Sequence, residues 1–226
     1  SSLFAARIGR IGVSPILASL DSESLLRSQG HDIISFTAGE PDFPTPSHVV
    51  DAAYVAMRAG DTKYPPLSGT TALKRAICEK FRGDNGLDYE PHQIIVSCGS
   101  KQAIYNAFMA PLDAGDEVVI PAPYWTSYPD MVQIAAGVPV IVDTCAEQGY
   151  QLDPERLDAA ITSRTKWLLL NSLSNPSGAV YSEQTLAGVA NVLTRYPHVQ
   201  ILCDDIYEHV VFDSPVRTLL QVPPGL

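Results

Sequence analysis

Short apolar runs begin to alternate with helical patterns near residue 94, and this change predicts the architecture of the chain. Strands that are buried on both faces read as continuous apolar runs, and crossover helices between them join parallel neighbours. The pattern therefore predicts an α/β fold with a mostly parallel sheet. The expected strands are Ile94 to Cys98, Glu117 to Pro121, Val138 to Val142, Trp167 to Asn171 and Val199 to Asp204, and the expected helices lie near residues 101–110, 125–135, 154–161 and 183–195.

The first part of the chain has a different pattern. Residues 1–46 mix short apolar runs with Gly, Ser and Pro, which predicts an arm and a loop. Apolar positions at intervals of three and four predict helices over residues 47–60 and 70–82, with Tyr64 in the loop between them. We therefore divide the chain into an N-terminal arm with a small-domain segment, residues 1–46, and a large domain, residues 47–226.

The composition limits the classes of molecule that the protein is expected to bind. Of the 226 residues, 46% are hydrophobic and 18% are charged, which suits a globular protein with a buried core. The formal net charge of −10 argues against a surface that wraps nucleic acid or adheres to a membrane, because both need clustered cations. The partner that this composition favours is a small molecule or another protein.

Cysteine usage predicts the compartment. The four cysteines, Cys78, Cys98, Cys145 and Cys203, lie far apart without a C-x-x-C pair, so neither a disulfide framework nor a zinc ribbon is indicated. Cys98 and Cys203 fall in apolar runs, so we expect buried free thiols in a reducing compartment. No run of about twenty apolar residues and no charged-then-apolar leader occurs. These patterns predict a cytoplasmic protein without a metal site.

An acid stands where the last apolar run stops. Asp204 ends that run, and Tyr207 follows three positions later. In an open α/β sheet, ligands bind outside the carboxyl ends of the strands, so both side chains would face a bound molecule. A carboxylate there can hold a proton on a heteroaromatic nitrogen, and a phenol can bond a neighbouring oxygen. The alternative is that Asp204 caps a following helix.

A glycine turn follows the first predicted strand. Gly99, Ser100 and Lys101 stand at the start of a predicted helix, where free N–H groups and the helix dipole favour an anion. The hydroxyl and the ammonium group can add direct bonds to a phosphate. The alternative is ordinary capping by Ser100 beside an exposed lysine. The sequence is not a P-loop.

Two further strand ends carry groups that suit a planar ligand. Tyr124 and Trp125 follow the second predicted strand, and tryptophan offers the larger face for stacking, although an aromatic beside a helix start is often core. Asn175 follows the fourth predicted strand and can donate an amide N–H into the crevice. The alternative for Asn175 is an ordinary turn residue before proline.

Taken together, these motifs resemble the fold-type I pyridoxal-phosphate enzymes, specifically the class I aminotransferases of the branch with bacterial aspartate and prephenate aminotransferases. The resemblance covers essentially the whole chain. It rests on G-E-P-D-F at 39–43, T-K-Y at 62–64, G-S-K-Q-A at 99–103, P-Y-W at 123–125, N-P-S-G at 175–178 and D-D-I-Y-E at 204–208. It implies an aminotransferase whose large domain, residues 47–226, binds pyridoxal 5'-phosphate.

The resemblance assigns a cofactor role to each strand-end motif. Asp204 would bind the pyridine nitrogen, Tyr207 and Asn175 the phenolic oxygen, and Trp125 would stack on the ring. The turn at 99–101, formed by Gly99, Ser100 and Lys101, would contact the phosphate or the substrate.

Roles toward the substrate and a second subunit also follow from the resemblance. Tyr64 would reach the phosphate of the neighbouring subunit, which implies a homodimer with shared sites. Gly39 would lie against the substrate carboxylate, because a residue without Cβ lets the chain come close. Ser14 would help to hold a distal carboxylate, but Ile16 removes a hydroxyl at this place, which favours an aromatic or aliphatic amino acid.

The lysine that anchors the cofactor in the family should follow the acid by roughly thirty residues. All five lysines precede Asp204, at positions 63, 74, 80, 101 and 166. We therefore expect these residues to be the N-terminal part of a longer polypeptide, inactive alone and truncated before that lysine. The alternatives are a carbon–sulfur lyase with the same cofactor, and a non-catalytic scaffold that has lost the lysine.

Overall fold

The structure is a computed structural model that describes residues 3–12, 14–37, 39–212 and 216–222. The chain forms two compact units. We call them the sheet unit, Ser1–Gly12 with Thr71–Leu226, and the helical unit, Val13–Thr70. The division at residue 46 stays a prediction.

The helical unit contains two α-helices, α1 (Pro15–Ser28) and α2 (Ser47–Arg58). The second helix was expected, but the first one shows that the prediction of only an arm and a loop before residue 47 was wrong. Pro15 occupies the first turn of α1, where proline is tolerated because its missing N–H would have no partner. Backbone with positive φ at Gly30 and Gly60 follows the two helices and stops each of them.

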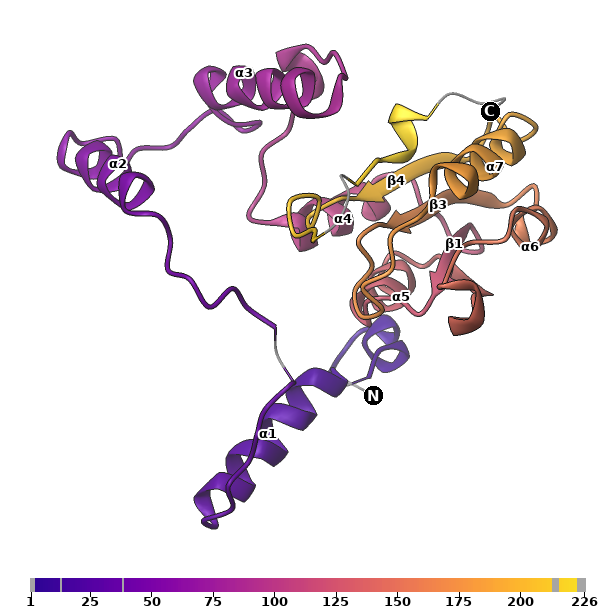
Figure 1. Cartoon of the computed structure of the whole chain (residues 1–226), viewed down its shortest axis with the longest axis horizontal. Coiled ribbons are helices and arrows are strands. Elements are labelled where there is room, and N and C mark those ends of the chain that lie inside the picture. The colour runs from indigo at the N-terminus through magenta and orange to yellow at the C-terminus, as the bar shows by residue number, and fades with distance from the viewer. Residues whose placement is uncertain (1–2, 13, 38, 213–215, 223–226) are drawn as a thin grey trace. The chain divides into compact units, whose positions relative to one another are not determined.

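The sheet unit is built on a four-stranded sheet in which every neighbouring pair is parallel (Figure 1). The strand order is β2-β1-β3-β4. The strands are β1 (Glu117–Ala122), β2 (Val138–Asp143), β3 (Thr165–Asn171) and β4 (Gln200–Asp204). All four were predicted close to these bounds.

The fifth predicted strand, Ile94 to Cys98, does not form. This segment is irregular between η3 (Pro91–Gln93) and α4 (Ser100–Met109), and Ile95 is 78% exposed. A strand needs a neighbour to satisfy its backbone N–H and C=O groups. Among the described residues, none of the four strands pairs with this segment, so its apolar pattern does not become a strand.

Helices connect the strands and extend before them. The predicted helix over 70–82 forms as α3 (Thr71–Lys80) and continues as a π-helical turn, η2 (Phe81–Asn85). The remaining helical elements of the sheet unit are η1 (Ala6–Arg10), α5 (Ser127–Ile134), η4 (Ala146–Gln148), α6 (Pro154–Ala160), α7 (Glu183–Leu193) and η5 (Leu219–Gln221).

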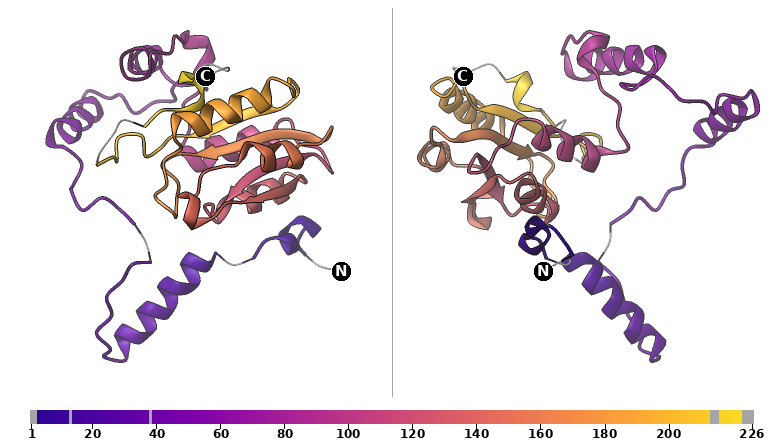
Figure 2. Two further views of the ribbon diagram at one scale, coloured as in Figure 1. Left: turned by 45° about the vertical axis from the view of Figure 1, so that its right-hand side comes forward. Right: turned by 180° about the vertical axis from the view of Figure 1, so that it is seen from behind.

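Two hydrophobic clusters, one on each face of the sheet, form the core. Successive side chains of β1 alternate: Val118 and Ile120 join the cluster with α4 and α5, whereas Val119 joins the cluster with α6 and α7. In β3, Leu169 joins the first cluster and its two neighbours join the second. Figure 2 shows these helices on opposite faces of the sheet. Burial on both faces explains why β1 and β3 read as continuous apolar runs.

The strand order fixes where a ligand can bind. The chain passes from β1 to β2 on one side and then crosses back to β3 on the other, so the order reverses between β1 and β3. Because all strands are parallel, Ala122, Asn171 and Asp204 end at the same edge. A crevice outside the carboxyl ends at such a reversal is the usual ligand site of an open α/β sheet.

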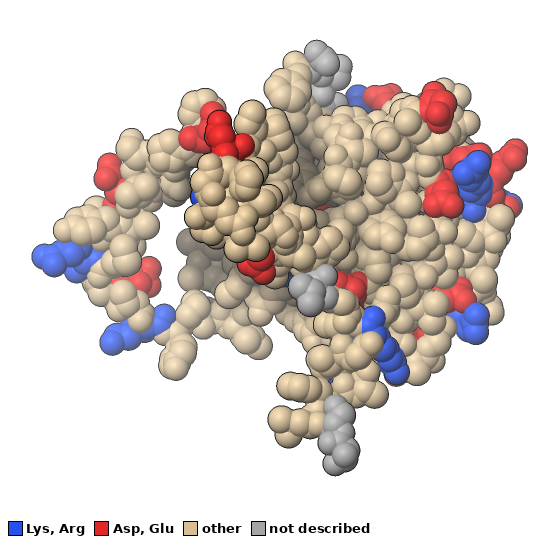
Figure 3. All heavy atoms as spheres, turned by 90° about the horizontal axis from the view of Figure 1, so that it is seen from below, with Lys and Arg blue, Asp and Glu red and all other residues tan. Residues whose placement is uncertain are grey.

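The surface carries both signs of charge. On the face seen in Figure 3, acidic and basic side chains are interspersed, and most of the area belongs to other residues. Within the described ranges, no helix is long and apolar enough to cross a membrane.

The contact between α6 and α7 leaves no room for a larger residue at Gly188. A Cβ there would lie 2.6 Å from Cγ of Pro154. We expect Gly188→Ala to lower the free energy of unfolding by about 1–3 kcal/mol, because overfilling a packed contact forces the helices apart. Gly83→Ala is the control, since its Cβ would meet open space. Denaturation by urea measures both, and equal stabilities would contradict the tight contact.

Candidate active site

Asp204 is a buried acid at the end of β4, with 8% of its surface exposed. The phenol of Tyr128 donates a hydrogen bond of 2.8 Å to its Oδ2. The side-chain amide of Asn171 donates to its backbone oxygen at 2.7 Å. A turn rather than a helix follows Asp204, so the alternative of a helix cap is wrong. The acid is therefore held by two partners at the ligand edge.

Tyr128 was not among the residues predicted for the site. It lies in the first turn of α5 and is 1% exposed. Burial, followed by the charge of Asp204, raises the pKa of the phenol well above its ordinary value, so the hydroxyl remains a donor. A buried tyrosine hydroxyl usually has a partner, and that rule was the only signal in the sequence. The sequence does not show which acid the partner is.

Trp125 connects the acid to the glycine turn. Its ring meets the ring of Tyr128 edge-on, with centroids 5.4 Å apart and planes at 84°. The Lys101 ammonium lies 4.7 Å from the centroid of the Trp125 ring. A chain of contacts thus runs from Lys101 of the turn at 99–101 through the indole and Tyr128 to Asp204.

The turn at 99–101 has the geometry of an anion site. Gly99 has φ of +87° and is the N-cap of α4, and no atom lies within 4 Å of the place where its Cβ would stand. Ser100 is the first residue of the helix and makes no side-chain capping bond, so the capping alternative is wrong. The open space and the N–H groups of the first helical turn suit a phosphate.

Asn171 also fixes the loop that carries Asn175. Its Oδ1 accepts a hydrogen bond of 2.8 Å from the backbone N–H of Asn175, while its amide group holds Asp204. Asn171 is 8% exposed and was predicted only as a strand end. Together with Tyr128 it lines a small cavity between the ends of β1 and β3.

Tyr207 lies in the turn after β4 and is partly buried. The next residue, Glu208, forms an ion pair with Lys80, and both groups hydrogen-bond to Asn85. Burial opposes ionisation of Glu208, but the hydrogen bonds from Asn85 and Lys80 outweigh it and lower the pKa of that carboxyl. The turn that carries Tyr207 is therefore anchored to the end of α3.

Asp205 is partly buried beside these groups. Burial raises the pKa of its carboxyl to about 6. The hydroxyl of Thr218 and the charge of Lys80 oppose that increase, whereas the charges of Glu208 and Asp204 add to it. This acid therefore favours the protonated form more than an exposed aspartate does.

The thiols differ in exposure. Cys98 is exposed, so the prediction that it is buried was wrong, because its segment does not enter the sheet. All four cysteines are free, as predicted. Cys203 in β4 is partly buried, and burial raises the pKa of its thiol to about 11, which makes it a poor nucleophile.

Three predicted site residues belong to the helical unit. Ser14 precedes α1, Gly39 is exposed in a segment without regular secondary structure, and Tyr64 is 103% exposed. Their approach to the site in the sheet unit stays a prediction.

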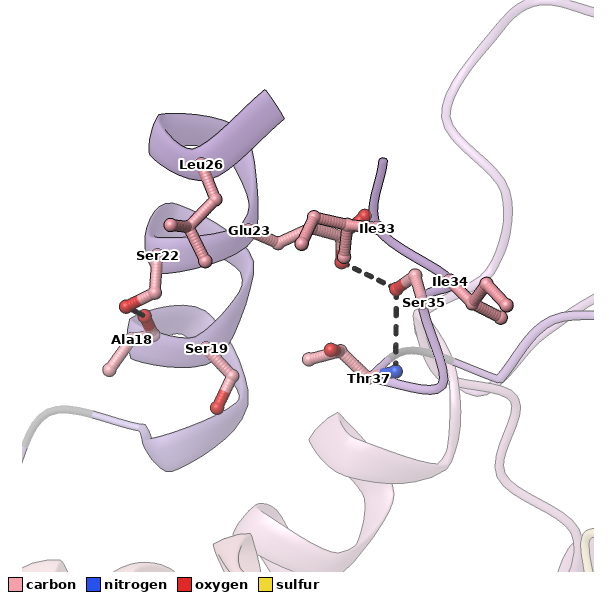
Figure 4. Close-up of a pocket in the computed structure, with 9 residues that line it drawn as sticks. All are labelled: Ala18, Ser19, Ser22, Glu23, Leu26, Ile33, Ile34, Ser35 and Thr37. Carbon is pink, nitrogen blue, oxygen red and sulfur yellow. Dashed lines mark hydrogen bonds between the residues drawn. The ribbon is translucent and has the colours of Figure 1, made fainter. Parts of the chain in front are cut away.

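A groove within the helical unit lies between α1 and residues 33–37 (Figure 4). The Ser35 hydroxyl donates to Glu23 Oε2 at 2.5 Å, and Arg27 forms a salt bridge of 2.9 Å with the other oxygen of that carboxylate. Arg27 also donates to the backbone oxygen of Ile33 at 2.6 Å. These bonds use the carboxylate to join the two segments, so we assign no chemistry to the groove.

The sheet unit fits pyridoxal phosphate at the strand ends. Open space beside Gly99 can take a phosphate, the indole of Trp125 offers a face for a ring, and Asp204 offers a buried carboxylate. Tyr128 uses only Oδ2 of that carboxylate, and no hydrogen bond between described residues uses Oδ1. A protonated ring nitrogen can therefore find an acceptor there.

Comparison with known proteins gives a family match over most of the chain. The sequence profile of the family described as aminotransferase class I and II matches residues 31–225. The chain is 49% identical, over all of its length, to the probable aspartate/prephenate aminotransferase of Rickettsia felis. It is 51% identical, over 97% of its length, to the aspartate/prephenate aminotransferase of Cereibacter sphaeroides. The chain spans 55% of each of these two relatives.

Solved structures share the fold. The chain matches the crystal structure of the aspartate aminotransferase from Rhizobium meliloti with a TM-score of 0.96 and 51% identity, over 100% of this chain and 57% of that one. It matches the Thermus thermophilus aspartate aminotransferase with maleate at a TM-score of 0.93 and 43% identity, over 98% of this chain and 58% of that one.

The raised pKa of Asp205 predicts how stability depends on pH. Because the folded state binds this proton more tightly than the unfolded state, stability falls as pH rises from about 4 to about 6. Asp205→Asn should remove this loss and raise stability above pH 6 by about 1–3 kcal/mol. Urea unfolding between pH 4 and pH 8 measures it. Asp113→Asn, at an exposed acid, is the control. A pH slope unchanged in Asp205→Asn would refute the assignment.

Proposed function

Because the chain belongs to the family of class I and II aminotransferases, we propose that it forms the cofactor-binding part of an enzyme that transfers an amino group from an L-amino acid to a 2-oxo acid. Family membership and the fold-type I architecture agree with the prediction, and the cofactor of this family is pyridoxal 5'-phosphate. The observation that carries the proposal is the buried Asp204 carboxylate at the ligand edge, joined through Tyr128 to the indole of Trp125.

Each predicted residue of the sheet unit has a place in this proposal. Gly99 and Ser100, in the turn at 99–101, would hold the phosphate at the N-terminus of α4. Trp125 would cover one face of the ring and exclude water from it. Asn175 and Tyr207 would donate hydrogen bonds to the phenolic oxygen, and Asp204 would accept one from the ring nitrogen.

The Asp204 carboxylate would control the protonation of the cofactor ring. When bound, the cofactor supplies a ring that accepts electrons from the bonds broken at the substrate's Cα. Asp204 keeps a proton on the ring nitrogen, and that positive charge makes the ring a stronger electron acceptor. The hydrogen bonds from Tyr128 and Asn171 hold the acid in place for this task.

The lysine that binds the cofactor covalently remains to be assigned. Lys80 is paired with Glu208, and Lys166 lies 3.8 Å from Asp116 at the amino end of β3, away from the ligand edge. We propose that this lysine comes from sequence outside these 226 residues, because the chain spans only 55% of its relatives and all its lysines precede Asp204.

Lys101 favours an acidic substrate over the aromatic or aliphatic one expected from Ile16. Its ammonium lies beside the stacking face of Trp125, where it can pair with a distal carboxylate. The names of the relatives, which include aspartate and prephenate, support a substrate with a second carboxylate.

A homodimer remains part of the proposal. The full exposure of Tyr64 supports a role toward a second subunit. The cytoplasmic location also stays a proposal, supported by four free cysteines. No observation favours the carbon–sulfur lyase or the non-catalytic scaffold.

The first test is amino transfer by the complete gene product. With aspartate and 2-oxoglutarate it should form oxaloacetate and glutamate, whereas ammonia and pyruvate would identify a lyase.

Asp204→Asn should weaken cofactor binding by about 100-fold or more, because it breaks a buried charge pair. Equilibrium dialysis against pyridoxal phosphate measures this affinity. Asp158→Asn is the control, because Asp158 also bonds a tyrosine, Tyr196. Unchanged binding in Asp204→Asn would reject the site.

The second test concerns Lys101. Lys101→Met should raise KM for aspartate by about 10- to 100-fold, because a charge-assisted bond is lost. The KM for phenylalanine, which has no second carboxylate, should change little. Steady-state kinetics with both substrates measure the split, and an equal rise for both would assign Lys101 to the phosphate instead.

A further inference from the structure

Tyr128 has a hydroxyl where its burial alone would favour phenylalanine. The side chain is 1% exposed and packs in the cluster formed by α4, α5 and the sheet. Removing a hydroxyl from water costs free energy unless it finds a partner. Its partner is Asp204, which lies 76 residues later in the chain, at 2.8 Å.

This hydrogen bond uses only one of the two carboxylate oxygens of Asp204. The Tyr128 hydroxyl donates to Oδ2, and none of the described residues forms a hydrogen bond to Oδ1. Asn171 holds the backbone of Asp204 from the neighbouring strand. The acid is thus fixed at both its backbone and its side chain, and one oxygen remains for a ligand.

The same tyrosine also supports the stacking residue. Its ring meets Trp125 edge-on at 5.4 Å, and its backbone N–H bonds the oxygen of Trp125 at 3.0 Å. One side chain therefore contacts both the group expected to bind the ring nitrogen and the group expected to cover the ring face.

We propose that Tyr128 is a positioning residue of the cofactor site. It holds the Asp204 carboxylate toward the ring nitrogen and keeps the Trp125 indole over the face of the cofactor ring. This inference rests on the proposed function. It assigns a role to a residue that touches neither the cofactor nor the substrate, and that role is exerted through Asp204.

Tyr128→Phe tests the proposal, because it keeps the ring and removes only the hydroxyl. Pyridoxal phosphate should bind the variant of the complete gene product about 10- to 100-fold more weakly, the range expected for a lost hydrogen bond to a charged group. The nitrogen-15 NMR signal of cofactor labelled at the ring nitrogen should also move away from that of the wild type. Tyr196→Phe is the matched control, since Tyr196 donates to Asp158 at 2.7 Å and lies in the segment between α7 and β4.

A double-mutant cycle separates positioning from a general effect on the fold. If Tyr128 acts through Asp204, Tyr128→Phe should have little further effect on cofactor affinity in the Asp204→Asn background. Equal losses in both backgrounds, or wild-type affinity and an unchanged nitrogen signal in Tyr128→Phe, would overturn the proposal. If the wild-type protein itself fails to bind the cofactor, the proposed function fails, and this inference fails with it.

Discussion

A carboxylate held out of water at the end of a strand is the constraint on which the site depends. A buried charge is costly unless hydrogen bonds or an opposite charge compensate for it. Asp204 receives one hydrogen bond at its side chain from Tyr128 and one at its backbone from Asn171. Two elements that arrive from different directions, α5 and β3, thus converge on β4. A cationic ring nitrogen would supply the remaining compensation.

The parallel sheet makes this convergence possible. The last residues of each strand lie at the same edge of the sheet. Groups that are far apart in sequence therefore lie close together there. The two-sided core holds these ends in place, because the central strands β1 and β3 are buried against helices on both faces. The rigid part of the molecule therefore positions the site, and the turns at the strand ends supply its chemistry.

Much of this arrangement could be predicted from the sequence, because its signals are local. The apolar runs of four strands and the turn at 99–101 were found by pattern alone. The segment from Ile94 to Cys98 has the same local pattern and fails as a strand, because strand formation also requires a neighbour. The partnership of Tyr128 with Asp204 could not be predicted, since it joins residues 76 positions apart through tertiary structure. Helix α1 was missed because its sequence is only weakly amphipathic.

The central claim is that Asp204 faces a pyridinium ring whose phosphate lies at the turn at 99–101. A crystal structure of the protein with pyridoxal phosphate tests it most directly. We predict the ring nitrogen about 2.7–2.9 Å from Oδ1 of Asp204, as expected for a charge-assisted bond, and the phosphate at the first N–H groups of α4. A ring nitrogen directed at another group, or a phosphate bound elsewhere, would contradict it.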